Sequence, residues 1–335
     1  MPQIKETIFA PPLEGGEWLQ HGPVDLQRVR GKAVVMVDFW DYTCVNCLRT
    51  LPYVAEWHRR YANAGLIIAG VHAPEFSFAR DRQRVAAAIG DLKLEYPVVL
   101  DGDYRIWRAY SNRYWPAKYL IDAEGRLRYY HFGEGMYAET ETRIQALLAE
   151  LNPATAFPPP MDPVRPSDHP GALCYRVTPE LYFGYERGQF GNPAGVIQER
   201  EAEYADPGRH AEGAIYLSGR WTVGREGARA GASGAAISLR FTARDVNLVM
   251  EPPAGGAARV AMELRGTHRP GADVKIEDGR MAIDVDRARM YALATNDSVA
   301  AGGLTLRALD AGVTAYAFTF ISCVVAGEGA DGKES

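Results

Sequence analysis

The pattern of hydrophobic and polar residues differs between the two halves of the chain. In the first 151 residues, apolar runs of strand length alternate with stretches whose apolar residues lie three and four positions apart, the spacing of one helix face. Strands are expected at 33–39, 66–72, 96–100, 118–122 and 126–132, and helices at 48–61, 78–89, 104–110 and 144–151. Such alternation ending in a hairpin predicts an α/β fold, a mixed sheet with helices on both faces.

After residue 171 the hydrophobic pattern is typical of β-strands, without helical periodicity. Apolar and polar residues alternate at 237–241, 246–250 and 260–264, and further strands are expected at 304–309 and 313–321. The Gly/Ala-rich runs at 227–236 and 253–258 are interpreted as loops. Short strands between glycine-rich turns predict an all-β, jelly-roll-like sandwich.

A proline-rich segment separates these two halves. Residues 152–171 read NPATAFPPPMDPVRPSDHPG and contain seven prolines. Proline lacks an N–H and has a fixed φ, so such a segment behaves as a semi-rigid spacer. We therefore predict an α/β domain at 1–152, a linker at 153–171, an all-β domain at 172–328 and a flexible tail at 329–335.

Composition narrows the class of protein. With 47% hydrophobic and 24% charged residues, the 335-residue chain is expected to fold. The net charge of −5 and the lack of a basic run argue against nucleic-acid binding. The sequence has no apolar stretch long enough for a membrane span and no secretory signal pattern at its start. These features predict a cytoplasmic protein, or an extracytoplasmic one if the sequence is part of a longer protein.

The most informative chemistry is the pair Cys44 and Cys47 in the segment DFWDYTCVNC, between a buried strand and a helix. Thiols at this spacing can form a disulfide across the first helical turn, and a helix N-terminus lowers the pKa of the first thiol. Cys44 is thus predicted to be the nucleophile and Cys47 the resolving thiol. A zinc site uses the same spacing, but no second ligand pair accompanies it, so neither a metal nor an organic cofactor is expected.

The surrounding residues resemble the active-site region of thioredoxin-like (redoxin) thiol-disulfide oxidoreductases, in particular the TlpA-like branch. Asp38 lies six residues before Cys44, at the family's buried carboxylate, and Pro52 lies eight residues after it, where the family's helix kinks. The segment YWPAKYLID resembles the family's cis-proline loop. The resemblance implies that Asp38 accepts the proton of Cys47. It also implies a cis Pro116 whose backbone lies beside the disulfide and pairs with substrate.

Three further positions are weaker candidates for substrate contact. Trp40 and Trp115 are predicted to flank the substrate groove, with core packing as the alternative for both. Glu75, in VHAPEF, corresponds to an acidic residue that modulates the thiols in some TlpA-like relatives, with a solvated loop residue as the alternative. The dipeptide between the cysteines is Val-Asn instead of the Gly-Pro of thioredoxins, which leaves the direction of electron transfer open.

The whole chain also resembles the soluble C-terminal region of DipZ-type proteins. The phrases FWDYTCVNCLRTLPY, GVHAPEF and YWPAKYLID carry this resemblance, together with the proline-rich spacer and the β domain after them. In DipZ-type proteins, the thioredoxin-like domain is followed by a module similar to carbohydrate-binding sandwiches. Those proteins also carry a membrane transporter part, which is not in this sequence.

Three functions compete at this point. The leading prediction is a thiol-disulfide oxidoreductase that acts on a protein or small-molecule disulfide or dithiol and exchanges electrons with an unidentified redox partner. A second is a binding protein whose β domain recognises a glycan or a protein through aromatic rings, with these candidates: Tyr216, Trp221, Tyr291 and Tyr316. A third is a thiol peroxidase, which the sequence disfavours because the Pro and Thr expected seven and three residues before the reactive cysteine are absent.

Two more cysteines lie near the start and end of the β domain. Cys174 and Cys323 could form a bridge that closes a long loop. In a reducing cytoplasm, two buried free thiols fit better. No catalytic role is expected for either residue.

Overall fold

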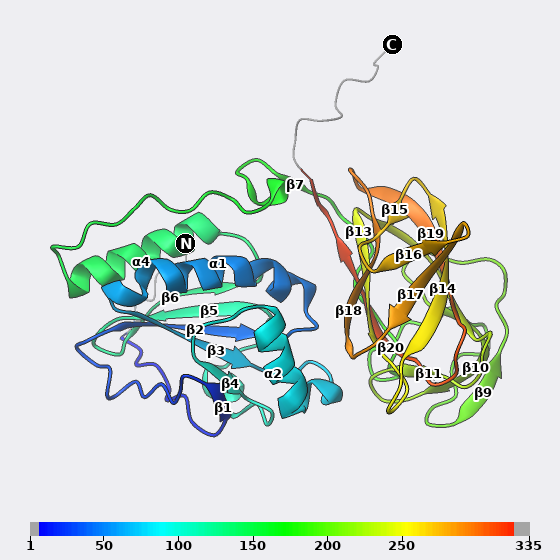
Figure 1. Ribbon diagram of the computed structural model, residues 1–335, viewed down its shortest axis with the longest axis horizontal. Helices are drawn as coiled ribbons and strands as arrows, with labels where there is room; N and C mark the ends of the chain where they lie inside the picture. Colours follow the sequence, from blue (N-terminus) through cyan, green and yellow to red (C-terminus); the bar gives the residue numbers. More distant parts are fainter. Residues whose placement is uncertain (1–6, 325–335) are drawn as a thin grey trace, which may run out of the picture. The chain divides into compact units, whose positions relative to one another are not determined.

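The computed structural model describes residues 7–324 (Figure 1). The chain divides into two compact units between Val164 and Arg165, within the proline-rich segment. Each unit has its own hydrophobic core, the first in two clusters and the second in one. No helix in the part of the chain that the structure describes is long and apolar enough to cross a membrane.

The first unit is the mixed α/β sheet that the sequence predicts. Its elements are β1 (Glu17–Gln20), β2 (Val34–Trp40), α1 (Val45–Tyr61), η1 (Ala62–Ala64), β3 (Leu66–His72), η2 (Ser77–Arg80), α2 (Arg82–Asp91), β4 (Val98–Leu100), α3 (Arg105–Ala109), β5 (Ala117–Ile121), β6 (Leu127–Phe132) and α4 (Tyr137–Leu151). The strand order is β1-β4-β3-β2-β5-β6. Strands β2, β3 and β4 are parallel, and β1, β5 and β6 join antiparallel to their neighbours.

Strand β2 lies inside this sheet and is buried on both faces. Because side chains alternate along a strand, Met36 and Trp40 lie in the core cluster that includes residues of α1, α2 and α4. Val37 and Phe39 lie in the opposite cluster, which includes α3. Asp38 has the same parity as Met36 and Trp40, so the alternation places its carboxylate on the face that α1 covers.

Two features of the first unit differ from the sequence prediction. Strand β1 was not expected, because it is a four-residue strand at the edge of the sheet, where it pairs with β4. The helix expected at 78–89 is split at Asp81, whose side chain accepts hydrogen bonds from the backbone N–H groups of Gln83 and Arg84. An aspartate N-cap of this kind begins a new helix, α2.

The first part of the proline-rich segment is bound to α1 and α4. Because prolines have no N–H, the segment uses the carbonyls of Pro158 and Pro159 and the N–H groups of Met161 and Val164. Their partners are, in that order, Gln145, Arg60, Glu141 and Tyr53. Residues 158–164 therefore follow the surface of the first unit.

The second unit is an antiparallel β structure, as predicted. Its elements are η3 (Pro166–Asp168), β7 (Leu173–Cys174), β8 (Leu181–Tyr182), β9 (Glu201–Tyr204), β10 (Tyr216–Val223), β11 (Ala228–Ala230), β12 (Ala236–Ala243), β13 (Asp245–Glu251), β14 (Ala258–Gly266), β15 (Arg269–Pro270), β16 (Val274–Glu277), β17 (Arg280–Val285), β18 (Arg289–Thr295), β19 (Ala300–Ala308), β20 (Thr314–Ile321) and β21 (Cys323–Val324). The main path runs β15-β18-β13-β20-β11-β10-β12-β19-β14-β17-β16.

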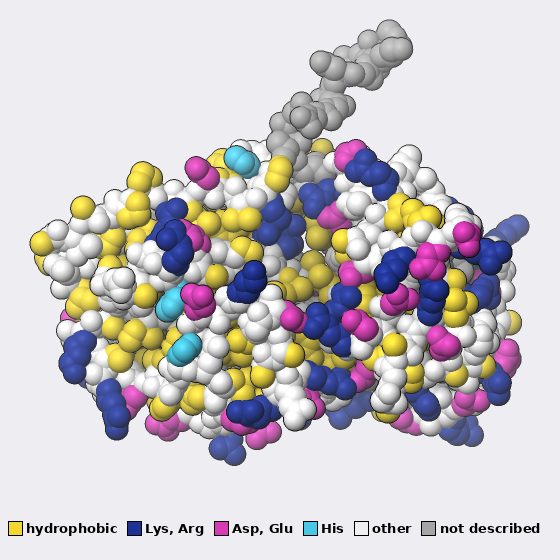
Figure 2. All heavy atoms as spheres, in the orientation of Figure 1, with side chains coloured by type: hydrophobic (Ala, Val, Ile, Leu, Met, Phe, Trp, Pro, Cys, Tyr) yellow, Lys and Arg dark blue, Asp and Glu magenta, His cyan; other side chains and the backbone are white. Residues whose placement is uncertain are grey.

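Strand β10 connects the two faces of this sandwich. Its first half pairs with β12 and its second half with β11. Gly219 lies between the halves with φ of 78°, a conformation that glycine adopts without strain. The chain can therefore leave one face for the other at this point. On the face drawn in Figure 2, basic and acidic side chains are intermixed over the β domain.

The second unit corrects one expectation from the sequence. Strand β11 lies within the Gly/Ala-rich run at 227–236 that was interpreted as a loop. Ala228 and Ala230 are buried there against the core, so their small side chains suit a closely packed strand. The tail predicted at 329–335 lies outside the described residues.

Candidate functional site

The Cys44–Cys47 pair lies where β2 leads into α1. Cys44 is the N-cap residue of α1, and its Sγ accepts a hydrogen bond from the backbone N–H of Cys47 (3.3 Å). Both thiols are free, and Cys44 is partly exposed whereas Cys47 is fully buried. The Cys44 sulfur thus satisfies one of the unpaired N–H groups of the first helical turn.

The two thiols differ in electrostatic environment. Burial raises the pKa of Cys47 well above its ordinary value, and the hydrogen bond and charge of Cys44 raise it further. Cys47 therefore holds its proton firmly while Cys44 is the accessible sulfur. The resolving step of a disulfide exchange would need a base close to Cys47.

Asp38 is the buried carboxylate of this site. Burial raises its pKa from 3.8 to about 7, and the opposite charge of Lys118 limits the rise. Within residues 7–324, neither carboxylate oxygen has a hydrogen-bond partner. A carboxyl group with a pKa near 7 can both accept and release a proton at neutral pH.

Lys118 is a site residue that the sequence analysis missed. It is fully buried on β5, directly opposite Asp38 in the antiparallel register. Burial lowers its pKa, while the negative charges of Asp38, Cys47 and Cys44 oppose that change. The only sequence signal is a lysine inside an otherwise apolar strand after Pro116. The register that places it against Asp38 comes from the fold.

Tyr96 and Asp41 complete the surroundings of the pair. The pKa of Tyr96 is raised by its burial and by the charges of Asp38 and Cys47, so its hydroxyl stays protonated. The buried Asp41 carboxylate accepts hydrogen bonds from the N–H (2.6 Å) and the hydroxyl (2.7 Å) of Thr43. It also accepts one from the backbone N–H of Glu75 (2.5 Å). Asp41 thus fixes the loop that leads into Cys44.

The structure separates the predicted substrate-contact residues. Trp40 is fully buried and packs edge-on against His72 (5.0 Å between ring centroids), so it belongs to the core and does not line a groove. Trp115 is partly exposed, and its Nε1 donates to the Ala73 carbonyl (2.9 Å). Glu75 is half-buried and reaches Asp41 through its backbone N–H.

Pro116 is buried, and the Trp115–Pro116 peptide bond is cis, as expected. The Pro116 carbonyl already accepts a hydrogen bond from the Gly133 N–H (2.8 Å), and proline has no N–H to donate. Backbone pairing with a substrate would therefore fall to Trp115 instead of Pro116. Among residues 7–324, no group of three or more His, Cys, Asp or Glu side chains is placed to hold a metal ion.

Two family models and several known proteins match parts of this chain. Residues 10–130 match the model of the AhpC/TSA family, and residues 178–320 match a family described as a thioredoxin-like C-terminal domain. The solved structure of a thioredoxin-like protein in its oxidised form is 26% identical, with a TM-score of 0.39, and covers 42% of this chain and 96% of its own. YkuV of Bacillus subtilis, a thiol-disulfide oxidoreductase, is 27% identical over 140 residues, 42% of this chain and 94% of YkuV.

The Cys-x-x-Cys pair at a helix N-terminus, the mixed sheet and the AhpC/TSA match define the first domain as thioredoxin-like, similar to the thiol-disulfide oxidoreductase YkuV. The whole arrangement is similar to protein DipZ of Mycobacterium bovis, with 39% identity over 252 residues and 74% of this chain. The match covers 36% of DipZ, so the chain spans about a third of the length of that relative.

Proposed function

We propose that this protein is a thiol-disulfide oxidoreductase that passes two electrons between a dithiol and a disulfide through Cys44 and Cys47. The observation that carries the proposal is the unequal pair of thiols at the start of α1, beside a buried carboxyl group with a pKa of about 7. Protein disulfides or dithiols are the proposed substrates. The second redox partner is the protein or small molecule that restores the pair.

The reaction follows from the accessibility of each sulfur. The Cys44 thiolate attacks one sulfur of a substrate disulfide, a mixed disulfide forms, and one substrate thiolate leaves. Asp38 takes the proton of Cys47, whose thiolate then attacks Cys44 and releases the second substrate thiolate. The enzyme ends with a Cys44–Cys47 disulfide and the substrate with two thiols. Lys118 and Tyr96 interact with both Asp38 and Cys47. The Lys118 ammonium would offset the negative charge that passes from Asp38 to Cys47 when the proton moves.

Two single-cysteine variants test this proposal. With a small aromatic disulfide as substrate, Cys44→Ser should abolish turnover, and Cys47→Ser should accumulate a mixed disulfide on Cys44 that intact mass spectrometry detects. Thr43→Ser, which changes a neighbouring hydroxyl residue and no thiol, serves as the matched control. Undiminished turnover by Cys44→Ser would contradict the proposal.

The same assay with hydrogen peroxide tests the peroxidase alternative. The positions seven and three residues before Cys44 hold Val37 and Asp41 instead of Pro and Thr. Asp41 is occupied by hydrogen bonds to Thr43 and Glu75, so it is not free to bind peroxide. Rapid catalytic consumption of peroxide would favour the peroxidase over the exchange enzyme.

The second pair of cysteines supports an extracytoplasmic location. Cys174 and Cys323 form a disulfide, which corrects the expectation of two buried free thiols. Disulfides persist in oxidising compartments and are rare where glutathione and thioredoxin keep thiols reduced. Acid quenching and alkylation of cells that make the Cys44→Ser/Cys47→Ser variant should find this pair oxidised, and a fully reduced pair would argue for the cytoplasm.

A ligand-binding role for the β domain needs a different surface from the one predicted. Tyr216, Trp221, Tyr291 and Tyr316 are all buried, so their rings have no face available for stacking. A hollow of about 380 Å³ lies elsewhere on the β domain. Its lining includes these residues: Arg209, His210, Arg240, Arg265, Gly303 and Thr305.

The hollow has the chemistry of an anion site. Arg240 on β12 and Arg265 on β14 are both opposite Gly303 of β19 in the strand register. The two arginines therefore flank a glycine, which leaves space between their side chains. We propose that it binds a carboxylate-bearing glycan, because planar guanidinium groups bind carboxylates well. Calorimetric titration of the full chain with an oligouronate should show binding that Arg240→Ala weakens. Arg269→Ala is the control, and equal binding of a neutral oligosaccharide would contradict an anion site.

A further inference from the structure

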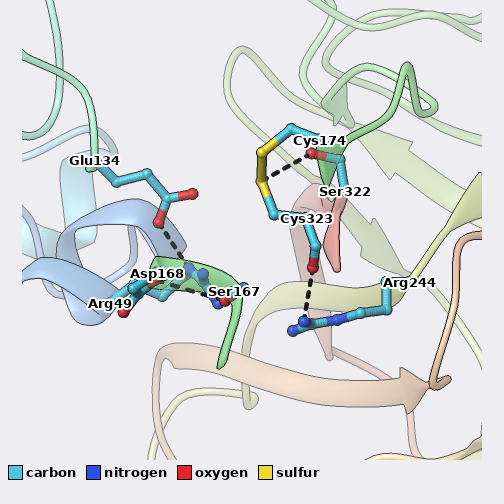
Figure 3. Close-up of a disulfide and its surroundings, with 8 residues drawn as sticks. All are labelled: Arg49, Glu134, Ser167, Asp168, Cys174, Arg244, Ser322 and Cys323. Atoms are coloured by element: carbon cyan, nitrogen blue, oxygen red, sulfur yellow. Dashed lines mark hydrogen bonds and ion pairs between the residues drawn. A yellow bond between two sulfur atoms is a disulfide. The ribbon is translucent and has the colours of Figure 1, made fainter. Parts of the chain in front are cut away.

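The disulfide of the β domain joins two short strands at its edge (Figure 3). Cys174 on β7 and Cys323 on β21 are direct partners in the register, and each strand has two residues. The bridge spans 149 residues of sequence. A purely structural interpretation is that it ties the start and the end of the domain together.

The exposure of this disulfide indicates a redox role in addition to a structural one. Cys174 is exposed and Cys323 is partly exposed, so a thiolate from solution can approach the bond. Exposed disulfides tend to be the labile or catalytic ones, whereas structural disulfides resist reduction. The pair β7 and β21 forms a separate two-stranded sheet, so attack on the bond does not have to open the main sheet.

The two sulfurs differ in what surrounds them. The Ser322 hydroxyl lies 3.6 Å from the Cys323 Sγ. The Arg244 guanidinium pairs with the Asp245 carboxylate and donates to the Cys323 carbonyl (2.8 Å), so it holds the Cys323 backbone in place. A hydroxyl that donates to a departing thiolate stabilises it. Cys323 is therefore the better leaving group, and the more exposed Cys174 is the sulfur to attack.

We propose that Cys174–Cys323 is a second redox centre, which accepts two electrons from a Cys-x-x-Cys dithiol, and that the Cys44/Cys47 dithiol of this protein is such a donor. The donor assignment rests on the proposed function. The Cys44 thiolate attacks the Cys174 Sγ, the Cys174–Cys323 bond breaks, and Cys323 leaves as a thiolate that takes up a proton. Cys47 loses its proton, attacks Cys44 and releases the Cys174 thiolate. At the end, Cys44 and Cys47 form a disulfide, and Cys174 and Cys323 are two free thiols.

Exchange between two variants tests the proposal directly. The donor is the reduced Cys174→Ser/Cys323→Ser protein, and the acceptor is the oxidised Cys44→Ser/Cys47→Ser protein. After equimolar mixing, alkylation and peptide mass spectrometry should show thiols appearing at Cys174 and Cys323 as they disappear from Cys44 and Cys47. In a Cys47→Ser protein that keeps the second pair, a Cys44–Cys174 crosslink should accumulate with Cys323 as the free thiol.

The outcomes separate this inference from the proposed function. A donor that reduces the small aromatic disulfide but leaves Cys174–Cys323 oxidised overturns the inference and leaves the proposed function intact. If the donor reduces neither disulfide, the proposed function fails, and the second redox centre is then tested with dithiothreitol as the reductant. Ready reduction of the folded acceptor by dithiothreitol would support Cys174–Cys323 as a redox centre, and resistance to reduction would contradict it.

The surroundings of Cys323 give a matched test. Ser322→Ala in the acceptor should slow its reduction by the donor about three- to tenfold, because the departing Cys323 thiolate loses its neighbouring hydroxyl. Arg229→Gln, which changes an exposed arginine on β11, should leave the rate unchanged. Equal rates for both variants would show that the Ser322 hydroxyl does not act on the leaving thiolate.

Discussion

Two buried ionisable residues, Asp38 and Lys118, are neighbours in the core of the first domain. They face each other across β2 and β5, and neither has a hydrogen-bond partner on its charged atoms within the described residues. Burial disfavours the charged form of each, and the charge of each favours the ionised form of the other. Asp38 therefore titrates near neutral pH, where the proposed exchange reaction would use it as a base.

We predict that Asp38→Asn stabilises the protein at alkaline pH. The folded-state pKa of Asp38, about 7, lies above its ordinary value of 3.8, so the stability tied to its neutral form is complete below pH 3.8 and is lost as the pH rises through 7. A rise of about three units corresponds to about 4 kcal/mol. Urea unfolding should show a gain of up to about that size at pH 8 and little change at pH 4. An equal gain at both pH values would contradict a titrating Asp38.

We also predict that Lys118→Met moves the pH dependence of activity. Without the ammonium group, the pKa of Asp38 should rise, so the pH at which disulfide exchange reaches half of its maximal rate should increase by about one unit. Stopped-flow rates between pH 5 and 9 measure this. Asp38→Asn is the reference, because it should remove the inflection and slow the reaction about 100-fold. An unmoved inflection in Lys118→Met would show that the pair is not coupled.

At the scale of elements, the buried Glu141 of α4 connects the proline-rich segment to two helices. Its carboxylate accepts hydrogen bonds from the Tyr61 hydroxyl, from Arg60 (3.1 Å) on the surface of α1 and from the backbone N–H of Met161 (2.8 Å). A buried carboxylate with several charged or polar partners is costly to remove, because those partners are left unsatisfied.

Glu141→Ala should therefore lower the free energy of unfolding of the first domain by about 2 to 4 kcal/mol. Glu139→Ala, on the same helix, removes a more exposed ion pair with Arg143 (3.6 Å) and should cost less than about 1 kcal/mol. Chemical denaturation of both variants makes the comparison. Equal losses would mean that the buried network does not stabilise α4 and the bound segment.

At the scale of the whole molecule, the two units have separate cores, and one disulfide closes the second. Closing a long loop removes conformational entropy from the unfolded chain. The double variant Cys174→Ser/Cys323→Ser should lose about 2 to 5 kcal/mol in the unfolding of the β domain. In calorimetry, the transition of the first domain should stay in place and serve as the internal control. A shift of both transitions together would show that the units unfold as one.

Spacing along the chain was enough to predict the Cys44–Cys47 pair, because less than one helical turn separates the two thiols. The prediction for Asp38 came from the resemblance to thioredoxin-like proteins, since a carboxylate at the end of a strand can equally face solvent. The period of the apolar residues predicted most elements of the first domain but only part of the second, where the expected strands correspond to β12, β13, β14, β19 and β20. Edge strand β1 and strand β11 are among the elements missed, because neither four residues at a sheet edge nor an alanine-rich run carries a periodic signal.

The sequence by itself determined the strand–cysteine–helix unit and the change from alternating strands and helices to strands alone, because each depends on residues close in the chain. Only the tertiary structure decided which distant residues meet. The β2–β5 register places Lys118 against Asp38, and the burial of Trp40 removes it from the substrate surface. The pairing of β7 with β21 joins Cys174 to Cys323. Contacts of this kind depend on strand register and core packing, which form only when segments far apart in sequence are folded together.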